Sequence, residues 1–290
     1  MTFPQKINIF IVDTVEKMLR HKERIQRIRK NSQTFNGPTQ VSGFYETGSS
    51  NIDKKSNKKI NVDNNKVLLC CIAKQENKYI GEWVTHYKNL GVDKIVIYDN
   101  NLPSYESIKN VPEIKEGIKS GLVEIKDAAG KQKYQCTAYN ICYQNNKNDY
   151  EWLMFFDVDE FLVLENHKDI HDFLRQDKFK NFNSILISWK VYSDNDLLRV
   201  ENDNYAVMSR FTTPSTNSGI NKQSKCILRG GLSNIRFANP HNPIVKLTCC
   251  DATGKEKVLT KARTTEIVHK GAWLNHYNRR SEERVSRNAE

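Results

Sequence analysis

The sequence predicts an α/β domain built on a mostly parallel β-sheet with helices on both faces. Short, wholly apolar segments alternate with segments in which apolar residues recur at the spacing of a helix. Strands that are buried on both faces of a parallel sheet are apolar throughout, and helices connect them. The predicted strands are 67–73, 94–98, 122–126, 152–156 and 184–189.

The segments between these strands carry helical spacing and helix stop signals. Residues 79–90 place their apolar residues on one face, and Gly91 follows as a stop. A second helical region begins at Pro103 and is expected to break at Pro112, because proline interrupts a helix. The remaining helices are expected at 134–144 and 170–175.

Composition divides the chain into three parts. Residues 1–30 have the pattern of a basic amphipathic helix, which could lie on an anionic membrane surface or pack on its own domain. Residues 31–66 are rich in Asn, Ser, Gly, Thr and Lys and are expected to form a linker or a poorly ordered arm. Residues 67–290 then form the single main domain.

The bulk composition limits the classes of function. A chain of 290 residues with 38% hydrophobic residues can bury a sizeable core, and no apolar run has transmembrane length. Seven cysteines without a CxxC pair, and no secretory signal, favour a cytoplasmic protein. The net charge of +11 invites a nucleic-acid interpretation, but no basic module with interleaved aromatic residues supports a specific nucleic-acid partner.

The most informative stretch is a strand that ends in acids. After Trp152–Phe156 come Asp157, Asp159 and Glu160. Asp157 and Asp159 are two residues apart, so they point the same way in an extended segment, and carboxylates this close repel each other unless a cation lies between them. Carboxylate oxygens suit Mg²⁺ or Mn²⁺. The alternative is that the aspartates only cap the next element.

Three polar segments follow predicted strands: Lys74–Glu76, Asp99–Asn101 and Asp157–Asp159. In open α/β sheets, ligands bind beyond the carboxyl ends of the strands, so these segments are expected to share one cleft. No glycine-rich loop follows the first strand, which argues against a dinucleotide-binding fingerprint or a P-loop.

Four separated blocks of the chain stand out: KQENKYIGEWVTHYKNLGVDKIVIYDNN, QCTAYNIC, EWLMFFDVDEFLVL and LNHYNRRSEER. Together they resemble glycosyltransferases of the GT-A fold, specifically the family 92 type and its family 2-like bacterial relatives. The resemblance runs from about residue 68 to 284, with the blocks in the expected order.

The resemblance implies roles for particular residues. Asp157 and Asp159 look like the DXD motif, which holds a divalent ion against the diphosphate of a nucleotide sugar. Asp159 is then the direct ligand, and Asp157 also contacts the ribose or metal-bound water. Asp99 would bind the base or the ribose, while Lys74 and Glu76 would border the same pocket.

His276 matches the histidine expected late in such sequences and is predicted as a third metal ligand. Mixed oxygen and nitrogen ligands favour Mn²⁺ over Mg²⁺. The alternative is a buried histidine bonded to the backbone. His241 lies in a stiff, turn-rich loop and could face the cleft, and Lys225 and Arg229 are candidates for phosphate contacts.

An inverting transferase needs a carboxylate that takes the proton of the acceptor hydroxyl. We expect Asp194 to be this catalytic base, with Asp196 and Glu160 as alternatives. Tyr192 or Trp189 could stack on a sugar face, although either could equally belong to the core.

The resemblance therefore implies a metal-dependent glycosyltransferase that moves a hexose from a nucleotide sugar, with a UDP-sugar favoured, to a saccharide or glycolipid acceptor. Such an activity would belong to polysaccharide or lipopolysaccharide biosynthesis at the inner membrane surface. Two alternatives remain open at this point. One is a nucleotidyltransferase that makes nucleotide sugars, and the other is a non-catalytic basic module that binds glycan or nucleic acid.

Overall fold

The computed structural model describes residues 64–192, 206–215, 218–258 and 266–277. The chain divides into two compact units, residues 1–56 and 57–290, and every described residue belongs to the second. The predicted helix at 1–30 and almost all of the predicted arm at 31–66 therefore lie outside the described residues.

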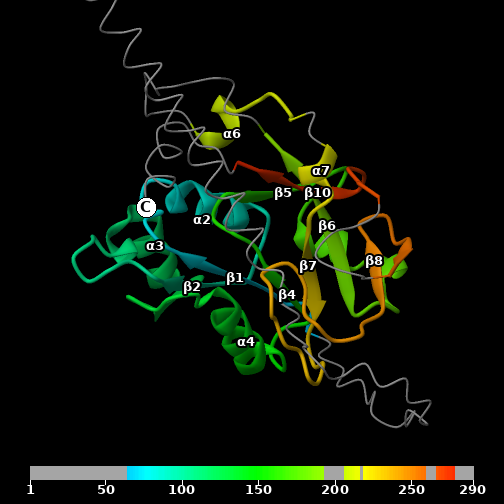
Figure 1. Ribbon diagram of the computed structural model, residues 1–290, viewed down its shortest axis with the longest axis horizontal. Helices are drawn as coiled ribbons and strands as arrows, with labels where there is room; N and C mark the ends of the chain where they lie inside the picture. The colour runs from blue at the N-terminus through cyan, green and yellow to red at the C-terminus, as the bar shows by residue number, and fades with distance from the viewer. Residues whose placement is uncertain (1–63, 193–205, 216–217, 259–265, 278–290) are drawn as a thin grey trace, which may run out of the picture. The chain divides into compact units, whose positions relative to one another are not determined.

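A mixed sheet with strand order β3-β2-β1-β4-β7-β6-β10-β5 forms the centre of the described unit (Figure 1). Its first four strands pair in parallel, as the sequence predicted. These strands are β1 (Val67–Ala73), β2 (Lys94–Asp99), β3 (Val123–Asp127) and β4 (Trp152–Phe155).

The second half of the sheet mixes directions. Strand β7 is antiparallel to both β4 and β6, and β10 is parallel to β6 but antiparallel to β5. The strands here are β5 (Glu160–Leu164), β6 (Ser184–Val191), β7 (Ser224–Arg229) and β10 (Ala272–His276). Two short strands, β8 (Cys249–Asp251) and β9 (Glu256–Lys257), extend the sheet beside β6.

Helices cover both faces of the parallel half. Residues of α2 (Ile80–Asn89), α3 (Pro112–Ser120) and α5 (Ile170–Leu174) belong to one apolar core, and those of α4 (Gln135–Asn146) belong to another. The shorter helices are η1 (Ile108–Asn110), η2 (Asp177–Phe179), α6 (Val207–Arg210) and α7 (Ser218–Asn221).

The predicted break at Pro112 is confirmed, because η1 ends at Asn110, Val111 is extended and a new helix, α3, begins at Pro112, although the helical region starts at Ile108 and not at Pro103. The first residues of a helix have no intrahelical partner for their N–H groups, and proline is therefore well tolerated there. The helix ends at Gly121, which adopts the left-handed conformation with φ of 81°.

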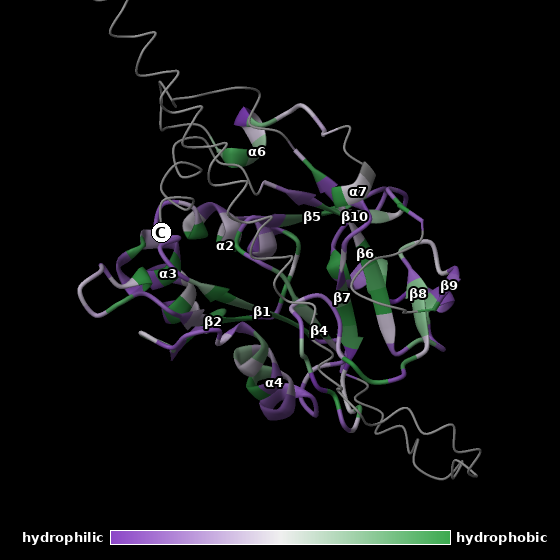
Figure 2. Cartoon of the chain, in the orientation of Figure 1, coloured by the Kyte–Doolittle hydropathy of each residue, from purple (hydrophilic) through white to green (hydrophobic). Residues whose placement is uncertain are grey.

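The two cores explain why β1 is apolar throughout. Leu69 and Cys71 point into one core, and Leu68 and Cys70 into the other, because alternate residues of a strand face opposite sides. Figure 2 shows the same apolar character along β6 and β7. The sheet is thus buried on both faces, and polar side chains gather where the strands end.

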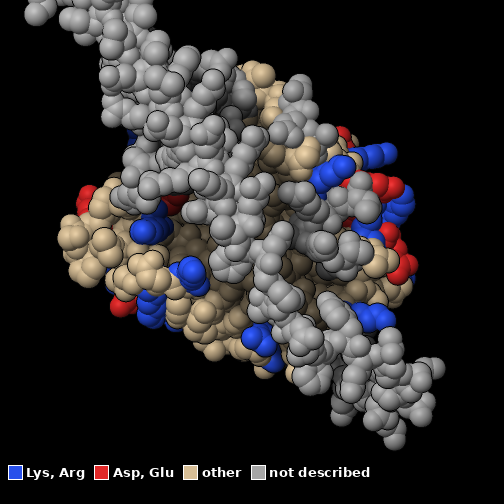
Figure 3. Space-filling model, in the orientation of Figure 1, with Lys and Arg blue, Asp and Glu red and all other residues tan. Residues whose placement is uncertain are grey.

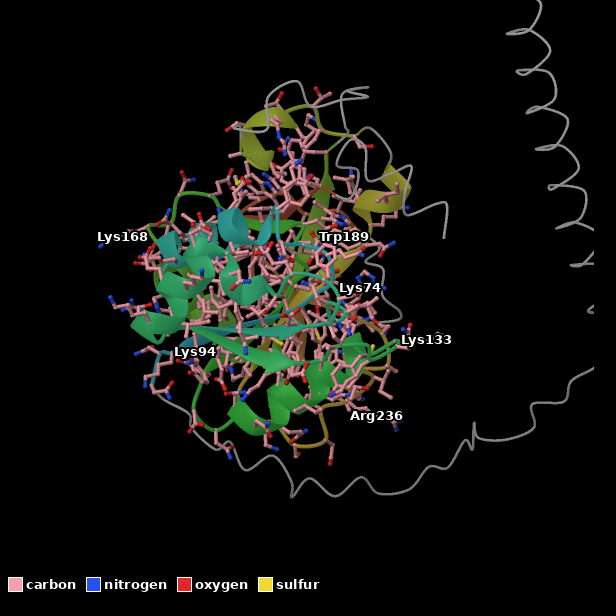
Figure 4. All side chains as sticks on the ribbon, turned by 90° about the vertical axis from the view of Figure 1, so that its left-hand side faces the viewer. Lys74, Lys94, Lys133, Lys168, Trp189 and Arg236 are labelled. Atoms are coloured by element: carbon pink, nitrogen blue, oxygen red, sulfur yellow. The ribbon has the colours of Figure 1, made fainter. Side chains whose placement is uncertain are left out.

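The carboxyl ends of the parallel strands lie at one edge, as predicted. Figure 4 places Lys74, which follows β1, and Trp189, near the end of β6, on one side of the described unit. Lys94, at the start of β2, lies on the other side. Because β7 is antiparallel to β4 and β6, its first residues share the edge of Lys74 and Trp189.

No helix in the described ranges is both long enough and apolar enough to span a membrane.

Candidate functional site

The turn between β4 and β5 places three carboxylates at this edge. The Asp157 N–H donates to Oε2 of Glu160 at 2.7 Å, and the Glu160 N–H donates to the Asp157 carbonyl at 3.0 Å. From α2, the indole N–H of Trp83 and the hydroxyl of Tyr87 both donate to the Glu160 carbonyl, at 3.0 and 2.9 Å. The turn is therefore fixed by its own bonds and by a buried helix.

Asp157 is held by three donors. Its Oδ1 accepts hydrogen bonds from Gln135 Nε2 at 2.6 Å and from the Tyr139 hydroxyl at 3.0 Å, and its Oδ2 faces Lys225 Nζ at 2.8 Å. Gln135 and Tyr139 lie four residues apart on α4, so both reach the same point. Sequence reasoning missed these two residues, although the block QCTAYNIC contains both and was the signal that could have found them.

Lys225 is an internal counter-ion. Its side chain has no exposed surface, and Nζ lies 2.8 Å from Asp157 Oδ2 and 3.6 Å from Glu160 Oε2. The predicted phosphate contact by Lys225 is therefore not what the structure shows. Burial opposes the ammonium charge, but the two carboxylates outweigh it and raise the Lys225 pKa.

Arg229 lies away from this edge, contrary to the prediction of a phosphate contact. Because β7 is antiparallel to β4, Arg229 pairs with Trp152 at the beginning of β4. Its guanidinium contacts Glu151 at 2.9 Å and packs over the Trp152 ring. The sequence could not show the direction of β7, and this direction decides which end of the strand lies at the carboxyl edge of the parallel strands.

Glu160 is buried completely beside these charges. Burial raises the pKa of its carboxyl to about 8, while Lys225 partly offsets this effect. Its Oε1 is buried and has no hydrogen-bond partner among the described residues. Glu160 therefore serves the turn, and its burial argues against the role of catalytic base.

Asp159 and His276 face each other. Strand β10 pairs with β5 so that His276 lies opposite Glu160, and the Tyr277 N–H donates to the Asp159 carbonyl at 2.9 Å. His276 Nε2 then lies 3.4 Å from Asp159 Oδ2. Burial disfavours the charged imidazole, but the neighbouring carboxylates, Asp159 first, raise the His276 pKa overall.

These two side chains fit a divalent ion that is also bound by a substrate. A carboxylate oxygen and an imidazole nitrogen are suitable ligands for Mn²⁺, and ions of this kind commonly take their other ligands from phosphates and water. Asp157, the third predicted ligand, faces the Lys225 ammonium. The described part of the chain contains no group of three or more His, Cys, Asp or Glu residues placed to hold a metal ion.

The loops after β1 and β2 are joined next to this turn. Asn101 is buried; its Oδ1 accepts a hydrogen bond from the Gln75 N–H at 2.6 Å, and its Nδ2 donates to Asn77 at 2.9 Å. Asp99 accepts hydrogen bonds from the Asn101 N–H and the Ser107 hydroxyl, both at 3.1 Å. The base or ribose contact predicted for Asp99 remains a prediction.

Lys74 and Glu76 both lie in the loop after β1, as expected. The Lys74 side chain is exposed, whereas Glu76 is buried, and the Glu76 carbonyl accepts hydrogen bonds from the first N–H groups around α2. Lys74 is therefore available to a ligand at this edge. The predicted roles of both residues at the nucleotide-sugar pocket remain predictions.

The remaining predicted residues have different outcomes. Asp194, the predicted catalytic base, and its alternative Asp196 lie outside the described residues. Tyr192 stacks on Tyr277 with ring centroids 5.2 Å apart. Trp189 is 8% exposed and packs on the imidazole of His276 with centroids 4.0 Å apart, so it supports this histidine more directly than it could stack on a sugar.

A mixed α/β domain with acids and a histidine at the carboxyl edge of its sheet is the arrangement expected of a GT-A type glycosyltransferase. The family model for glycosyltransferase family 92 matches residues 66–288, and the chain belongs to this family.

Curated relatives agree with this assignment. A family 92 protein from Arabidopsis thaliana is 25% identical over 77% of this chain and 34% of its own length. Another from Ricinus communis is 26% identical over 42% of this chain and 20% of its own length. The chain thus spans about a third or less of the curated relatives it matches.

Solved structures of the S. aureus protein TarS are among those that the chain resembles. A fragment of TarS in complex with UDP-GlcNAc is 13% identical in sequence, covers 76% of this chain and 61% of its own, and has a TM-score of 0.42.

We predict that Lys225→Met destabilises the fold by about 1–3 kcal/mol, because it leaves the half-buried Asp157 carboxylate without its counter-ion. Denaturant unfolding measures this change. The double variant Asp157→Asn/Lys225→Met, which removes both charges, should recover part of the loss. A Lys225→Met protein as stable as the wild type would contradict the assigned role.

We also predict a pH-dependent effect of Glu160→Gln. The Glu160 pKa rises from 4.5 to about 8 on folding, so the unfolded chain loses a proton that the folded chain keeps. This contribution to stability is complete below pH 4.5 and is lost as the pH rises through about 8. The variant should lack this part of the slope, which approaches about 1.4 kcal/mol per pH unit.

Urea unfolding of both proteins at several pH values in this range, with a chelator present, gives the difference. Because Glu160 also raises the His276 pKa, the same comparison is repeated in a His276→Gln background to isolate the contribution of Glu160. Parallel stability curves would show that Glu160 is ionised in the folded state.

Proposed function

We propose that the chain transfers a hexose from a nucleotide sugar, with a UDP-sugar favoured, to a saccharide or glycolipid acceptor, and that it inverts the anomeric centre. A divalent ion, Mn²⁺ in preference to Mg²⁺, would be held by Asp159 and His276. One observation carries this proposal: these two side chains lie 3.4 Å apart at the carboxyl edge of a family 92 domain.

When bound, the ion supplies the positive charge that stabilises the departing nucleoside diphosphate. The support of the site comes from residues of the chain. Lys225, Gln135 and Tyr139 fix Asp157 and thereby the turn that carries Asp159. This support keeps Asp159 in place without movement of the backbone, which is the preorganisation that a metal ligand needs.

The donor nucleotide would lie along the ends of β1 and β2. Lys74 is exposed there and can approach a phosphate, and the joined loops of Asn101 and Asp99 form a rigid border for the base or ribose. Asp194 remains our proposed base for the acceptor hydroxyl. Its support is its place in the sequence, soon after β6.

The two rival functions lack a specific observation in their favour. The loop after β1 contains no glycine between Lys74 and Ile80, unlike the glycine-rich basic loop expected of a nucleotidyltransferase. On the face shown in Figure 3, the Lys and Arg side chains of the described residues are dispersed. On that face, the described residues do not form the continuous basic stripe that is typical of nucleic-acid-binding proteins.

We predict that Mn²⁺ with a matching UDP-sugar raises the melting temperature of the wild type by about 5–10 °C at ligand concentrations far above Kd. Asp159→Asn should lose most of this rise because it weakens one of the two proposed ligands. A thermal-shift panel of UDP-glucose, UDP-galactose and UDP-GlcNAc, with Mn²⁺ or with EDTA, tests this.

Asp149→Asn is the matched control, because Asp149 is exposed and remote from the turn. Metal-dependent stabilisation that survives in Asp159→Asn would refute the proposed ligand set. Stabilisation that persists in EDTA would refute the dependence on metal.

The chain is proposed to act in the cytoplasm, with residues 1–30 contacting the inner membrane surface. Support comes from the basic amphipathic pattern of this segment. We predict that anionic vesicles containing phosphatidylglycerol sediment the full chain, and that deleting residues 1–30 abolishes this at moderate salt. Neutral phosphatidylcholine vesicles are the control, and equal sedimentation of both proteins would disprove the contact.

A further inference from the structure

His241 lies in the loop Asn239–Pro243 and has a defined tautomer. Its Nδ1 lies 3.0 Å from the Ser224 carbonyl, which can only accept, so Nδ1 carries the proton. In a neutral ring, Nε2 is then an acceptor with a free lone pair. The loop itself is fixed, because Asn239 Oδ1 accepts hydrogen bonds from the N–H groups of His241 and Asn242 at 2.9 and 3.1 Å.

The ring of His241 lies next to the Asp159–His276 pair. It packs on the Trp189 indole with centroids 5.3 Å apart, and the same indole packs on His276 at 4.0 Å. Ser224, which holds His241, directly precedes Lys225 in β7. Burial and the nearby Lys225 ammonium lower the His241 pKa, which agrees with a neutral ring.

Several polar atoms around His241 have no partner within the described residues. They are the indole nitrogen of Trp189, both amide atoms of Asn242 and the hydroxyl of Ser224. These side chains are buried, at 8%, 4% and 0% exposure. Buried polar atoms are normally hydrogen-bonded, so a group of unpaired donors and acceptors next to a binding edge points to a polar ligand.

The chemistry of this group favours sugar hydroxyls. Trp189 offers a donor, His241 Nε2 offers an acceptor, and the Asn242 amide offers both. A hydroxyl both donates and accepts, so a sugar ring can satisfy all of them. A phosphate oxygen can only accept, and it would face the lone pair of Nε2.

We propose that His241 is a sugar-binding residue whose Nε2 accepts a hydrogen bond from a ring hydroxyl of a substrate sugar, with Asn242 and Trp189 beside it. The inference rests on the proposed function and identifies the part of the site that recognises sugar. The hydroxyl belongs either to the sugar of the donor or to that of the acceptor, and the experiment separates these sources.

Two substitutions at His241 test the roles of its two ring nitrogens separately. His241→Asn keeps an N–H near the position of Nδ1 and so retains the bond to the Ser224 carbonyl, but it has no atom at Nε2. His241→Gln gives up the Nδ1 position and places an amide oxygen near that of Nε2. If His241 only stabilises its loop, the protein should tolerate His241→Asn better than His241→Gln. If His241 binds a sugar, substrate binding should tolerate His241→Gln better than His241→Asn.

Calorimetric titration with UDP and with UDP-glucose, UDP-galactose and UDP-GlcNAc, all with Mn²⁺, tests the donor. If the hydroxyl belongs to the donor, His241→Asn should weaken binding of the preferred UDP-sugar roughly tenfold, in line with one lost hydrogen bond. Binding of UDP alone should change less than about twofold, and His241→Gln should stay within about threefold of the wild type.

Transfer to methyl glycosides of glucose, galactose and N-acetylglucosamine tests the acceptor. If the hydroxyl belongs to the acceptor, donor binding and donor hydrolysis stay unchanged, and kcat/KM for transfer falls roughly tenfold in His241→Asn only. Equal behaviour of His241→Asn and the wild type in both assays overturns the inference. So does equal loss of UDP and UDP-sugar binding.

Binding by the wild-type protein in the same titrations tests the proposed function. If the wild type binds neither UDP nor any UDP-sugar, the proposed function and this inference both fail. If it binds a UDP-sugar and the His241 variants match it both in these titrations and in transfer to the glycosides, only the role of His241 fails. Melting temperatures of both variants confirm that each is folded at the temperature of the assay.

Discussion

The ion pair between Lys225 and Asp157 connects the two halves of the sheet. Asp157 follows β4, the last parallel strand, and Lys225 belongs to β7, the first strand of the mixed half. A lysine with no exposed surface is stable only beside a carboxylate, because burial of an unpaired charge is costly. The pair therefore fixes the junction, and α4 adds two further hydrogen bonds to the same carboxylate.

The three acids of the turn differ in their contacts at this junction. Asp157 is occupied by donors from the protein, Glu160 is fully buried with a raised pKa, and Asp159 faces His276. Three neighbouring carboxylates thus have three environments, and their environments decide their chemistry. Trp189 extends the arrangement, since its indole lies against both His276 and His241.

The sequence predicted the parallel half well, because uninterrupted apolar strands and helical spacing are local signals. It also located the acidic turn and His276. It could not predict that Lys225 lies inside, since a lysine in a strand looks the same whether its partner is solvent or a carboxylate on a distant strand. Arg229 was misplaced for a related reason: only the direction of β7 sends Lys225 to the cleft and Arg229 to the opposite edge.

The ion pair between Asp157 and the buried Lys225 has an evolutionary consequence. A descendant protein that had lost its activity could not readily lose Asp157. Without this aspartate the buried Lys225 would lack its nearer counter-ion, and the less stable chain would be exposed to aggregation and proteolysis. Persistence of the first acid in a descendant is thus poor proof of retained activity. Asp159 lies outside the Lys225–Asp157 pair and faces His276, so under the proposed function its retention is the better marker of activity.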